Sequence, residues 1–397
     1  MKNKVELLAP AGDKEKAYFA LEYGADAVYL GAKQYSLRAR SSNFEIEDIE
    51  EIVEYAHKKN KKVYLVTNII CHNFLLQDFD LFIEKIKQIK IDAFICADPF
   101  IITQIRKKIP NAEIHISTQQ SITNSKASLF WKKHGATRVI LSREMKLDEI
   151  ELLCKNLENK IDVEMFIHGA VCISYSGRCM MSNNFSLRDS NVGGCAQSCR
   201  WEYEILTEPK IKNSFTMSAK DMVYIMHLEK LLSLNLCSFK IEGRMKTINY
   251  LSSVIKVYRK IIDDYYAKKP LDLLEGKNKL VEVANREIDD AFLIDANSNK
   301  MLYHDIQKVL KQNFAFNVLK KISNQEYLII SKNNFNIFQR FQIISPIFEK
   351  EIKILKMINV EQDREVTTIN TPLTKAIIKL SEPIEMDQYC LGRIINE

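Results

Sequence analysis

The chain lacks the features of a secreted or membrane-spanning protein. Its 397 residues contain no run of about eighteen uncharged apolar residues, so the sequence indicates no transmembrane helix and no membrane partner. The first ten residues are interrupted by Glu6 and Pro10 and do not form the apolar core of a signal peptide. We therefore expect a cytoplasmic chain, in which thiols stay reduced and structural disulfides are disfavoured.

Common catalytic motifs are absent as well. The sequence contains no H-E-x-x-H and no G-x-S-x-G, the signatures of zinc peptidases and of many serine hydrolases. The sequence is still compatible with a Ser/His/Asp triad, because the members of such a triad need not be adjacent in sequence. Neither sign of charge dominates: 57 Lys and Arg against 51 Asp and Glu leave a net charge of +6. That charge permits an anionic partner without requiring one.

What the chain does contain, over residues 1–265, is an alternation of short apolar strands and amphipathic helices. The strand candidates are runs of β-branched and apolar residues, as in strands buried on both faces. Eight strands, each followed by a helix, predict an α/β fold of the TIM-type (β/α)8 barrel class, with a doubly wound open sheet as the alternative. The predicted strands are Val5–Ala9, Ala27–Leu30, Lys62–Thr67, Ala93–Ala97, Glu113–Ser117, Arg138–Leu141, Asp162–His168 and Ser238–Ile241.

The interval between the seventh and eighth strands is more than twice as long as any other, and it holds a cysteine-rich segment at 171–203. In a TIM barrel the loop after a strand lies on the C-terminal face, where active sites are built. The topology therefore predicts that this loop lies over the barrel mouth.

The pattern changes after the barrel. Residues 266–312 read as a linker with helical segments, and residues 313–397 as a small β-rich domain. The latter prediction rests on four strand-like runs, at Tyr327–Ser331, Ile337–Ile344, Ile352–Ile358 and Ala376–Leu380.

Four cysteines in the loop, Cys172, Cys179, Cys195 and Cys199, have the spacing C-x6-C-x15-C-x3-C. Thiolates are soft ligands, and four from one loop can enclose a zinc ion or an iron–sulfur cluster. Only the last pair has the C-x2–4-C spacing typical of zinc sites, so the wide gaps favour a cluster. Buried or disulfide-bonded cysteines are the alternative to a metal site.

Titratable residues gather near strands seven and eight. His168 ends strand seven and is a candidate general acid/base, or else a strand-end histidine bonded to the backbone. Glu164 and Glu242 lie within strands, where a carboxylate is costly unless it is paired or binds a charged substrate. Their candidate partners are the arginines of the loop and of strand eight, namely Arg178, Arg188, Arg200 and Arg244.

Polar residues also follow strands three and five. At the C-terminal ends of barrel strands such side chains contact substrates, although turn and cap duties explain them equally well. They are Thr67, Asn68, Asn73, Ser117, Thr118, Gln119 and Gln120.

Several motifs together resemble the collagenase-like peptidase family, peptidase family U32. They are L-L-A-P-A-G at 7–12, D-A-V-Y-L-G at 26–31, H-G-A-V-C-I-S-Y-S-G-R-C at 168–179, C-R-W-E-Y at 199–203 and F-K-I-E-G-R-M-K at 239–246. Members of this family carry the name of peptidases, and several are 4Fe–4S proteins that act in hydroxylation of tRNA, ribosomal RNA or ubiquinone precursors. The C-R-W-E-Y segment is most similar to the branch that hydroxylates the wobble uridine of tRNA to 5-hydroxyuridine with prephenate.

The resemblance implies a set of roles. The four loop cysteines would ligate a 4Fe–4S cluster, with prephenate as co-substrate and tRNA as partner, alongside a second family member or a second copy of the chain. His168 and Glu164 are then the catalytic candidates, and the candidates for substrate binding are Arg178, Arg200, Arg244 and Glu242. The family's N-R-G appears here as Asn285, Arg286 and Glu287. A collagenase-like peptidase and a zinc-stabilised, non-catalytic RNA-binding protein are the alternatives.

Overall fold

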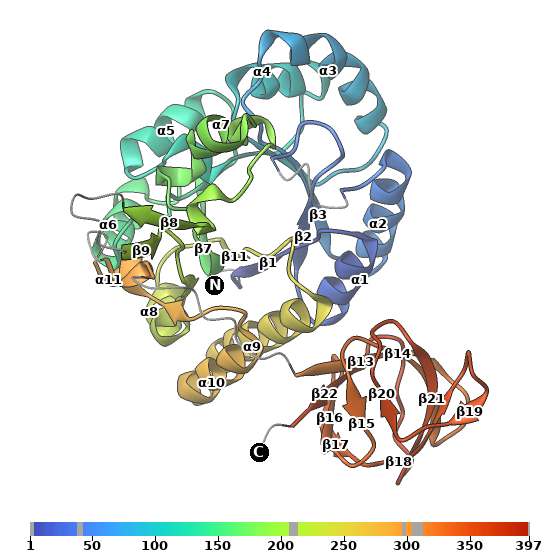
Figure 1. Ribbon diagram of the computed structural model, residues 1–397. Coiled ribbons are helices and arrows are strands. Elements are labelled where there is room, and N and C mark those ends of the chain that lie inside the picture. Colours follow the sequence, from blue (N-terminus) through green and yellow to red (C-terminus); the bar gives the residue numbers. More distant parts are fainter. Residues whose placement is uncertain (1–3, 38–42, 206–212, 296–298, 304–312, 396–397) are drawn as a thin grey trace. The chain divides into compact units, whose positions relative to one another are not determined.

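The computed structural model describes residues 4–37, 43–205, 213–295, 299–303 and 313–395 (Figure 1). The chain divides into two compact units. The first comprises residues 1–21 and 25–309, and the second residues 22–24 and 310–397.

The first unit contains a closed barrel of eight parallel strands. Seven strands pair in chain order, and β11 closes the barrel by pairing with both β1 and β7. The predicted TIM-type barrel is therefore confirmed, with every predicted strand present and three matched at both ends. The barrel strands are β1 (Glu6–Pro10), β2 (Ala27–Leu30), β3 (Lys62–Thr67), β4 (Ala93–Cys96), β5 (Ile114–Ile116), β6 (Arg138–Ile140), β7 (Asp162–Ala170) and β11 (Ser238–Ile241).

Helices surround the barrel (Figure 1), and most of them bury apolar side chains. In α2 the buried residues are Ile49, Ile52, Val53 and Ala56, which recur at helical spacing. The start of α4 is fixed by Asp98, whose side chain accepts the Phe100 amide at 2.8 Å. These helices are α1 (Lys14–Glu22), α2 (Ile46–Lys58), α3 (Asn73–Ile86), α4 (Pro99–Lys108), α5 (Ser125–Lys133), α6 (Leu147–Leu157), α8 (Leu228–Ser233) and α9 (Ile248–Tyr266).

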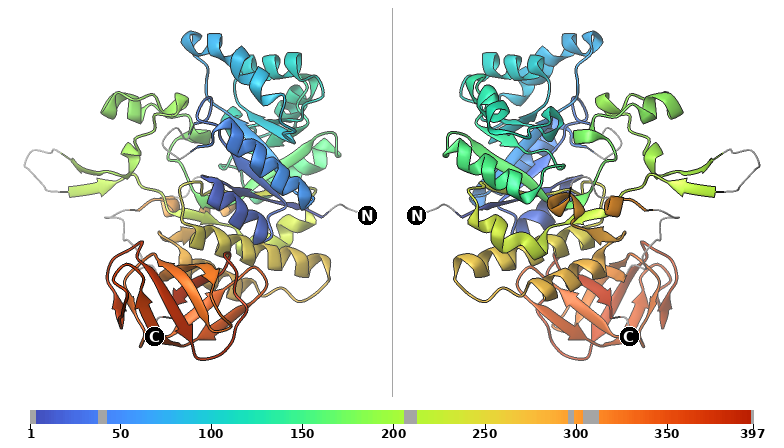
Figure 2. Two further views of the ribbon diagram at one scale, coloured as in Figure 1. Left: turned by 90° about the vertical axis from the view of Figure 1, so that its right-hand side faces the viewer. Right: turned by 90° about the vertical axis from the view of Figure 1, so that its left-hand side faces the viewer.

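The long interval after β7 forms a substructure of its own, as its length suggested. It contains helix α7 (Met181–Ser186) and a hairpin of β8 (Glu202–Ile205) and β9 (Asn213–Thr216). Figure 2 shows both projecting from the same side of the barrel. The chain then returns through β10 (Asp221–Val223), which pairs antiparallel with the end of β7. Both ends of the interval are thereby held at one strand.

The segment after α9 stays with the first unit. Helix α10 (Leu273–Val283) packs on α9, and β12 (Ile288–Asp289) pairs in parallel with β10 before the short helix α11 (Ala291–Ile294). Among the residues that the structure describes, no helix is both long and apolar enough to cross a membrane.

The second unit is built on an antiparallel eight-stranded sheet in the order β17-β16-β22-β13-β14-β21-β18-β19, with a separate β15–β20 pair. Its own core is formed by side chains such as Phe316, Tyr327, Phe341 and Ile378. The strands are β13 (Phe314–Lys321), β14 (Glu326–Ser331), β15 (Phe335–Asn336), β16 (Phe341–Ile344), β17 (Glu349–Ile352), β18 (Ile354–Asn359), β19 (Arg364–Glu365), β20 (Thr368–Ile369), β21 (Lys375–Leu380) and β22 (Leu391–Ile394).

Two strand predictions in this unit were wrong. The run Ile352–Ile358 is divided between β17 and β18, which pair with different neighbours. The run Ile337–Ile344 becomes a strand only from Phe341, because the side chain of Asn336 accepts the Phe338 amide at 3.0 Å and folds the preceding residues into a turn.

Candidate active site

A cavity of about 180 Å³ lies at the C-terminal end of the barrel, between the strand ends and the cysteine loop. One wall comes from the strands and the residues that follow them, including Tyr29, Asn68, Ser117, Gln119, Ile140, Arg143, Glu144, Phe166, Lys240, Glu242 and Arg244. The other wall comes from the loop, including Cys172, Ser174, Ser176, Cys179, Ser182, Ser190, Cys195, Gln197 and Cys199. The loop therefore lies over the barrel mouth, as the topology predicted.

All four loop cysteines line this cavity, and each is partly buried. Burial raises the pKa of the Cys199 thiol; Arg200 lowers it, and Cys172, Cys195 and Cys179 raise it further. The thiols are thus close enough to influence one another. The Met181 amide donates a hydrogen bond to the Cys179 sulfur at 3.3 Å, a contact typical of cluster-ligating sulfurs.

The donor set fits an iron–sulfur cluster, because four soft thiols from one loop meet in one cavity. In the part of the chain that the structure describes, no group of three or more His, Cys, Asp or Glu side chains is arranged to hold a metal ion.

The loop is held in place by polar contacts with the barrel. Glu144, just after β6, accepts the Ser176 amide at 2.7 Å. The Ile70 amide, after β3, donates to the Asn191 carbonyl at 3.0 Å. Within the loop, the Ala196 amide donates to Ser182 Oγ at 3.0 Å. These bonds connect both halves of the loop to the barrel mouth.

Three basic side chains line the cavity, and the structure holds each of them in place. The Arg143 guanidinium lies 4.0 Å from the centre of the Phe166 ring and donates to the Ala170 carbonyl at 3.2 Å. Arg244 is buried and donates from Nη2 to Ser36 Oγ at 3.1 Å. Lys240 is buried as well. Such fixed cations favour the binding of an anionic ligand.

Glycines of three sequence motifs make room for the segment that carries Glu242 and Arg244. A Cβ at Gly31 would lie 2.4 Å from Arg244 Nη1, and one at Gly12 would lie 1.9 Å from the Arg244 carbonyl oxygen. Gly169 has a φ of +115°, and its Cβ would lie 2.4 Å from the Glu242 carbonyl oxygen. The motifs therefore meet around one wall of the cavity.

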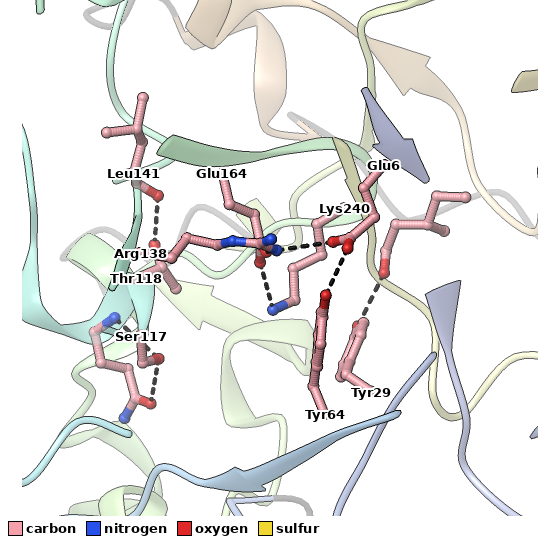
Figure 3. Close-up of polar contacts among 11 residues, drawn as sticks. Glu6, Tyr29, Tyr64, Ser117, Thr118, Arg138, Leu141, Glu164 and Lys240 are labelled. Carbon is pink, nitrogen blue, oxygen red and sulfur yellow. Dashed lines mark hydrogen bonds and ion pairs between the residues drawn. The ribbon is translucent and has the colours of Figure 1, made fainter. Parts of the chain in front are cut away.

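Below the cavity, the barrel interior contains a buried ionic network (Figure 3). Arg138 donates to Glu6 at 2.8 Å and to Glu164 at 2.9 Å, and Lys240 donates to the other oxygen of Glu164 at 2.9 Å. Tyr64 donates to Glu6 at 2.5 Å. Burial would raise the pKa of Glu164, but the charges of Lys240 and Arg138 outweigh it and lower that pKa to about 2.

Glu164 is thus paired, as a buried carboxylate requires, but its partners are not the arginines suggested by the sequence. It lies in the barrel interior and outside the cavity lining, so it reaches the cavity only through Lys240.

His168 is also buried, and it lies outside the cavity lining. The Tyr258 hydroxyl donates to the Ile167 carbonyl at 3.3 Å, so it accepts from His168 Nδ1 at 3.2 Å. Nε2 then accepts from the Tyr250 hydroxyl at 2.8 Å. Burial lowers the pKa of His168 to about 3, and the imidazole is neutral near pH 7.

The four residues predicted to bind substrate separate into two pairs. Glu242 and Arg244 line the cavity. Arg178 is exposed on the loop, and Arg200 is half-buried, and neither belongs to the lining. Burial and the positive charge of Arg286 lower the pKa of Arg200, whose Nη1 has no hydrogen-bond partner among the described residues.

The sequence also contained a signal that pointed to Arg143 and Lys240. Arg143 follows strand six within the polar run S-R-E at 142–144. Asn68 and Gln119 were candidate substrate contacts because they follow strands three and five in the same way. Lys240 lies inside strand eight, where alternation of side chains along the strand aims it into the barrel.

Comparison with known proteins adds to this geometry. A model of peptidase family U32 matches residues 12–302. The chain is 38% identical over 399 aligned residues to the tRNA hydroxylation protein P1 of Bacillus subtilis, covering 96% of this chain and 93% of that protein. It is 35% identical over 264 residues to the 23S rRNA 5-hydroxycytidine C2501 synthase of Escherichia coli, covering 66% of this chain and 40% of that protein. It is also 32% identical over 278 residues to a collagenase of Porphyromonas gingivalis, covering 66% of each.

Proposed function

The chain belongs to peptidase family U32, and from this premise we propose that it hydroxylates RNA, converting the wobble uridine of tRNA to 5-hydroxyuridine. The observation that carries the proposal is the match to the tRNA hydroxylation protein P1, which extends over 96% of this chain and 93% of that protein. The match to the ribosomal RNA enzyme covers 40% of that protein, so the alignment favours tRNA.

In this proposal Cys172, Cys179, Cys195 and Cys199 hold a 4Fe–4S cluster, which their shared cavity supports. When bound, such a cluster would supply electron transfer or a Lewis-acidic iron next to the substrate. The contribution of the chain is to keep the four thiols on one loop and to surround them with a partly enclosed cavity.

The basic residues of the cavity suit prephenate, a small dicarboxylate, as co-substrate. The Arg143 guanidinium is held over the Phe166 ring, and it can form a forked pair with one carboxylate. Arg244 is fixed by Ser36 and by the close approach of Gly31, and it offers a second charge on the same cavity wall. Placing both charges in advance lowers the entropy cost of binding a dianion.

The outer face of the cysteine loop offers aromatic surface for RNA. Phe185 and Trp201 are exposed, by 54% and 42%, and their ring centres lie 6.4 Å apart. Exposed rings of this kind stack on unpaired bases such as those of an anticodon loop. The net charge of +6 supports association with the phosphate backbone.

The proposal is tested by deleting the gene in its host and measuring tRNA nucleosides by mass spectrometry. We expect 5-hydroxyuridine and its derivatives to disappear and to return when the wild-type gene is supplied. Arg143→Gln should restore several-fold less modification, because a carboxylate contact is lost. Arg188→Gln is the matched control, since Arg188 is exposed on the same loop and lies outside the cavity lining. Unchanged nucleosides together with degradation of gelatin by the purified protein would establish a peptidase instead.

A further inference from the structure

Gln119 brings to the cavity wall a buried donor that the described residues do not satisfy. Gln119 lies in the turn after β5, is 3% exposed and lines the cavity. Its Nε2 has no hydrogen-bond partner among the described residues. A buried amide without a partner costs free energy, so such a group in a cavity wall points to a ligand that carries an acceptor.

The orientation of this amide is set by a chain of hydrogen bonds. The Leu37 amide donates to Asn68 Oδ1 at 3.3 Å, which directs Asn68 Nδ2 toward Gln119. Asn68 Nδ2 then donates to Gln119 Oε1 at 2.7 Å, and Ser117 Oγ donates to the same oxygen at 3.2 Å. Because two donors meet Oε1, the nitrogen of Gln119 is the end that is left for a ligand.

A second donor belongs to Lys240, which lines the same cavity. Its Nζ lies 4.5 Å from the centre of the Tyr29 ring and 5.3 Å from that of Phe166. Of its three protons, one goes to Glu164, the single hydrogen-bond acceptor that the described residues offer it. Burial lowers the pKa of Lys240, and an anion in the cavity would offset that effect.

A buried ionic network holds Lys240 in place (Figure 3). Glu164 is shared between Lys240 and Arg138, and Arg138 is shared between Glu164 and Glu6. Two carboxylates therefore balance two cations, and the ammonium is anchored without leaving an unpaired buried charge. Lys240 is a binding residue in this arrangement, and Glu164 is a positioning residue.

We propose that Gln119 Nε2 and Lys240 Nζ form a subsite for a carboxylate of a small organic acid, on the strand wall of the cavity. The proposal rests on the proposed function, in which that acid is prephenate, and it names the residues that would bind one of its two carboxylates. Gln119 and Lys240 both line this cavity of about 180 Å³, so a single small ligand could contact both. Apolar side chains beside the subsite, among them Val66, Ile95 and Ile140, would contact its carbon skeleton.

The test is calorimetric binding of prephenate to the purified full-length protein and to Gln119→Glu. This substitution keeps the acceptor that Asn68 and Ser117 require and replaces the donor by a charged oxygen. We expect it to weaken prephenate binding by roughly 10- to 100-fold, as for loss of a hydrogen bond to a charged group. Gln77→Glu makes the same chemical change at an exposed position of α3 and should bind like wild type, because Gln77 lies outside the cavity lining. The visible spectrum should be the same in all three proteins.

Unchanged affinity in Gln119→Glu, or an equal loss in Gln77→Glu, would overturn the subsite. Inorganic phosphate that binds the wild type as tightly as prephenate would also overturn it, in favour of a phosphate site for RNA. The tRNA assay separates this proposal from the proposed function. If Gln119→Glu fully restores 5-hydroxyuridine, the subsite alone is rejected. If the protein binds the carboxylate but 5-hydroxyuridine is missing from the tRNA of both the deletion strain and the wild-type strain, the function alone is rejected.

Discussion

At the scale of single residues, burial decides which titratable groups can act on a ligand. His168 and Glu164 have the residue types of catalysts, yet their polar atoms are engaged inside the barrel. Arg143 and Lys240 line the cavity, and each keeps N–H donors that no acceptor among the described residues takes up. A sequence shows the type of a residue and its position in a predicted strand. It does not show the hydrogen-bond partners of a buried side chain, because these come from elements that are distant in sequence.

The buried histidine makes the stability of the barrel depend on pH. The folded-state pKa of His168 is about 3, whereas an unfolded histidine titrates near 6.5. Below pH 6.5 the unfolded chain binds a proton that the folded chain does not, so this contribution to stability is complete above pH 6.5 and is lost as pH falls toward 3. At pH 5.5 the loss amounts to about 1.4 kcal/mol.

Replacement of this histidine should remove that dependence. We expect His168→Gln to flatten the change in the free energy of urea unfolding between pH 7.5 and 5.5 by about 1.4 kcal/mol. His134→Gln, at an exposed position, should leave the wild-type profile. If the profiles of wild type and His168→Gln stay parallel, the histidine is not buried in its neutral form.

At the scale of elements, the barrel strands were predictable because they are buried on both faces and read as continuous apolar runs. β2, β3 and β11 match the sequence prediction at both ends. The interior of the cysteine loop was not predictable. Helix α7 has six residues and the rest of the loop is fixed by bonds such as Glu144 to the Ser176 amide, which leave no periodicity in the sequence.

The iron content of the protein should depend on the loop cysteines, which are the ligands of the proposed cluster. We expect Cys195→Ser to lose the brown colour and the iron of the wild-type protein purified without oxygen, because one of four thiolate ligands is removed. Cys154→Ser is the matched control, since Cys154 is buried in α6 and lies outside the cavity. Iron analysis and the visible spectrum are the measurements.

Loss of the cluster should loosen the loop and spare the barrel. In the proposed arrangement, the binding free energy of the cluster would contribute to folding of the loop, while the barrel has its own core. Limited proteolysis of Cys195→Ser should therefore cut between about residues 173 and 201, where exposed backbone is accessible, and nowhere in the barrel strands. Global unfolding of this variant, or retention of its iron, would contradict the assignment.

At the scale of the whole molecule, the two units differ in how well the sequence predicts them. The α/β alternation of the barrel repeats over many elements, so errors at one strand end do not change the fold. In the second unit the strands are short and half-exposed, and side chains such as Asn336 decide where each begins. β13 and β22, which are neighbours in the sheet, were not among the predicted strands.

The second unit has its own buried core, and we therefore expect residues 313–395 to fold as an isolated domain with a cooperative urea transition. Phe316 is fully buried, and its ring fills the space over Gly392, where a Cβ would lie 2.3 Å from the ring. Phe316→Ala should lower the free energy of unfolding by about 3–5 kcal/mol, the usual cost of a large cavity. Phe338→Ala makes the same chemical change at a residue that is 81% exposed, and should alter stability by less than about 0.5 kcal/mol. Equal effects of the two substitutions, or a non-cooperative transition in the isolated wild-type domain, would show that this core does not by itself specify the fold of the unit.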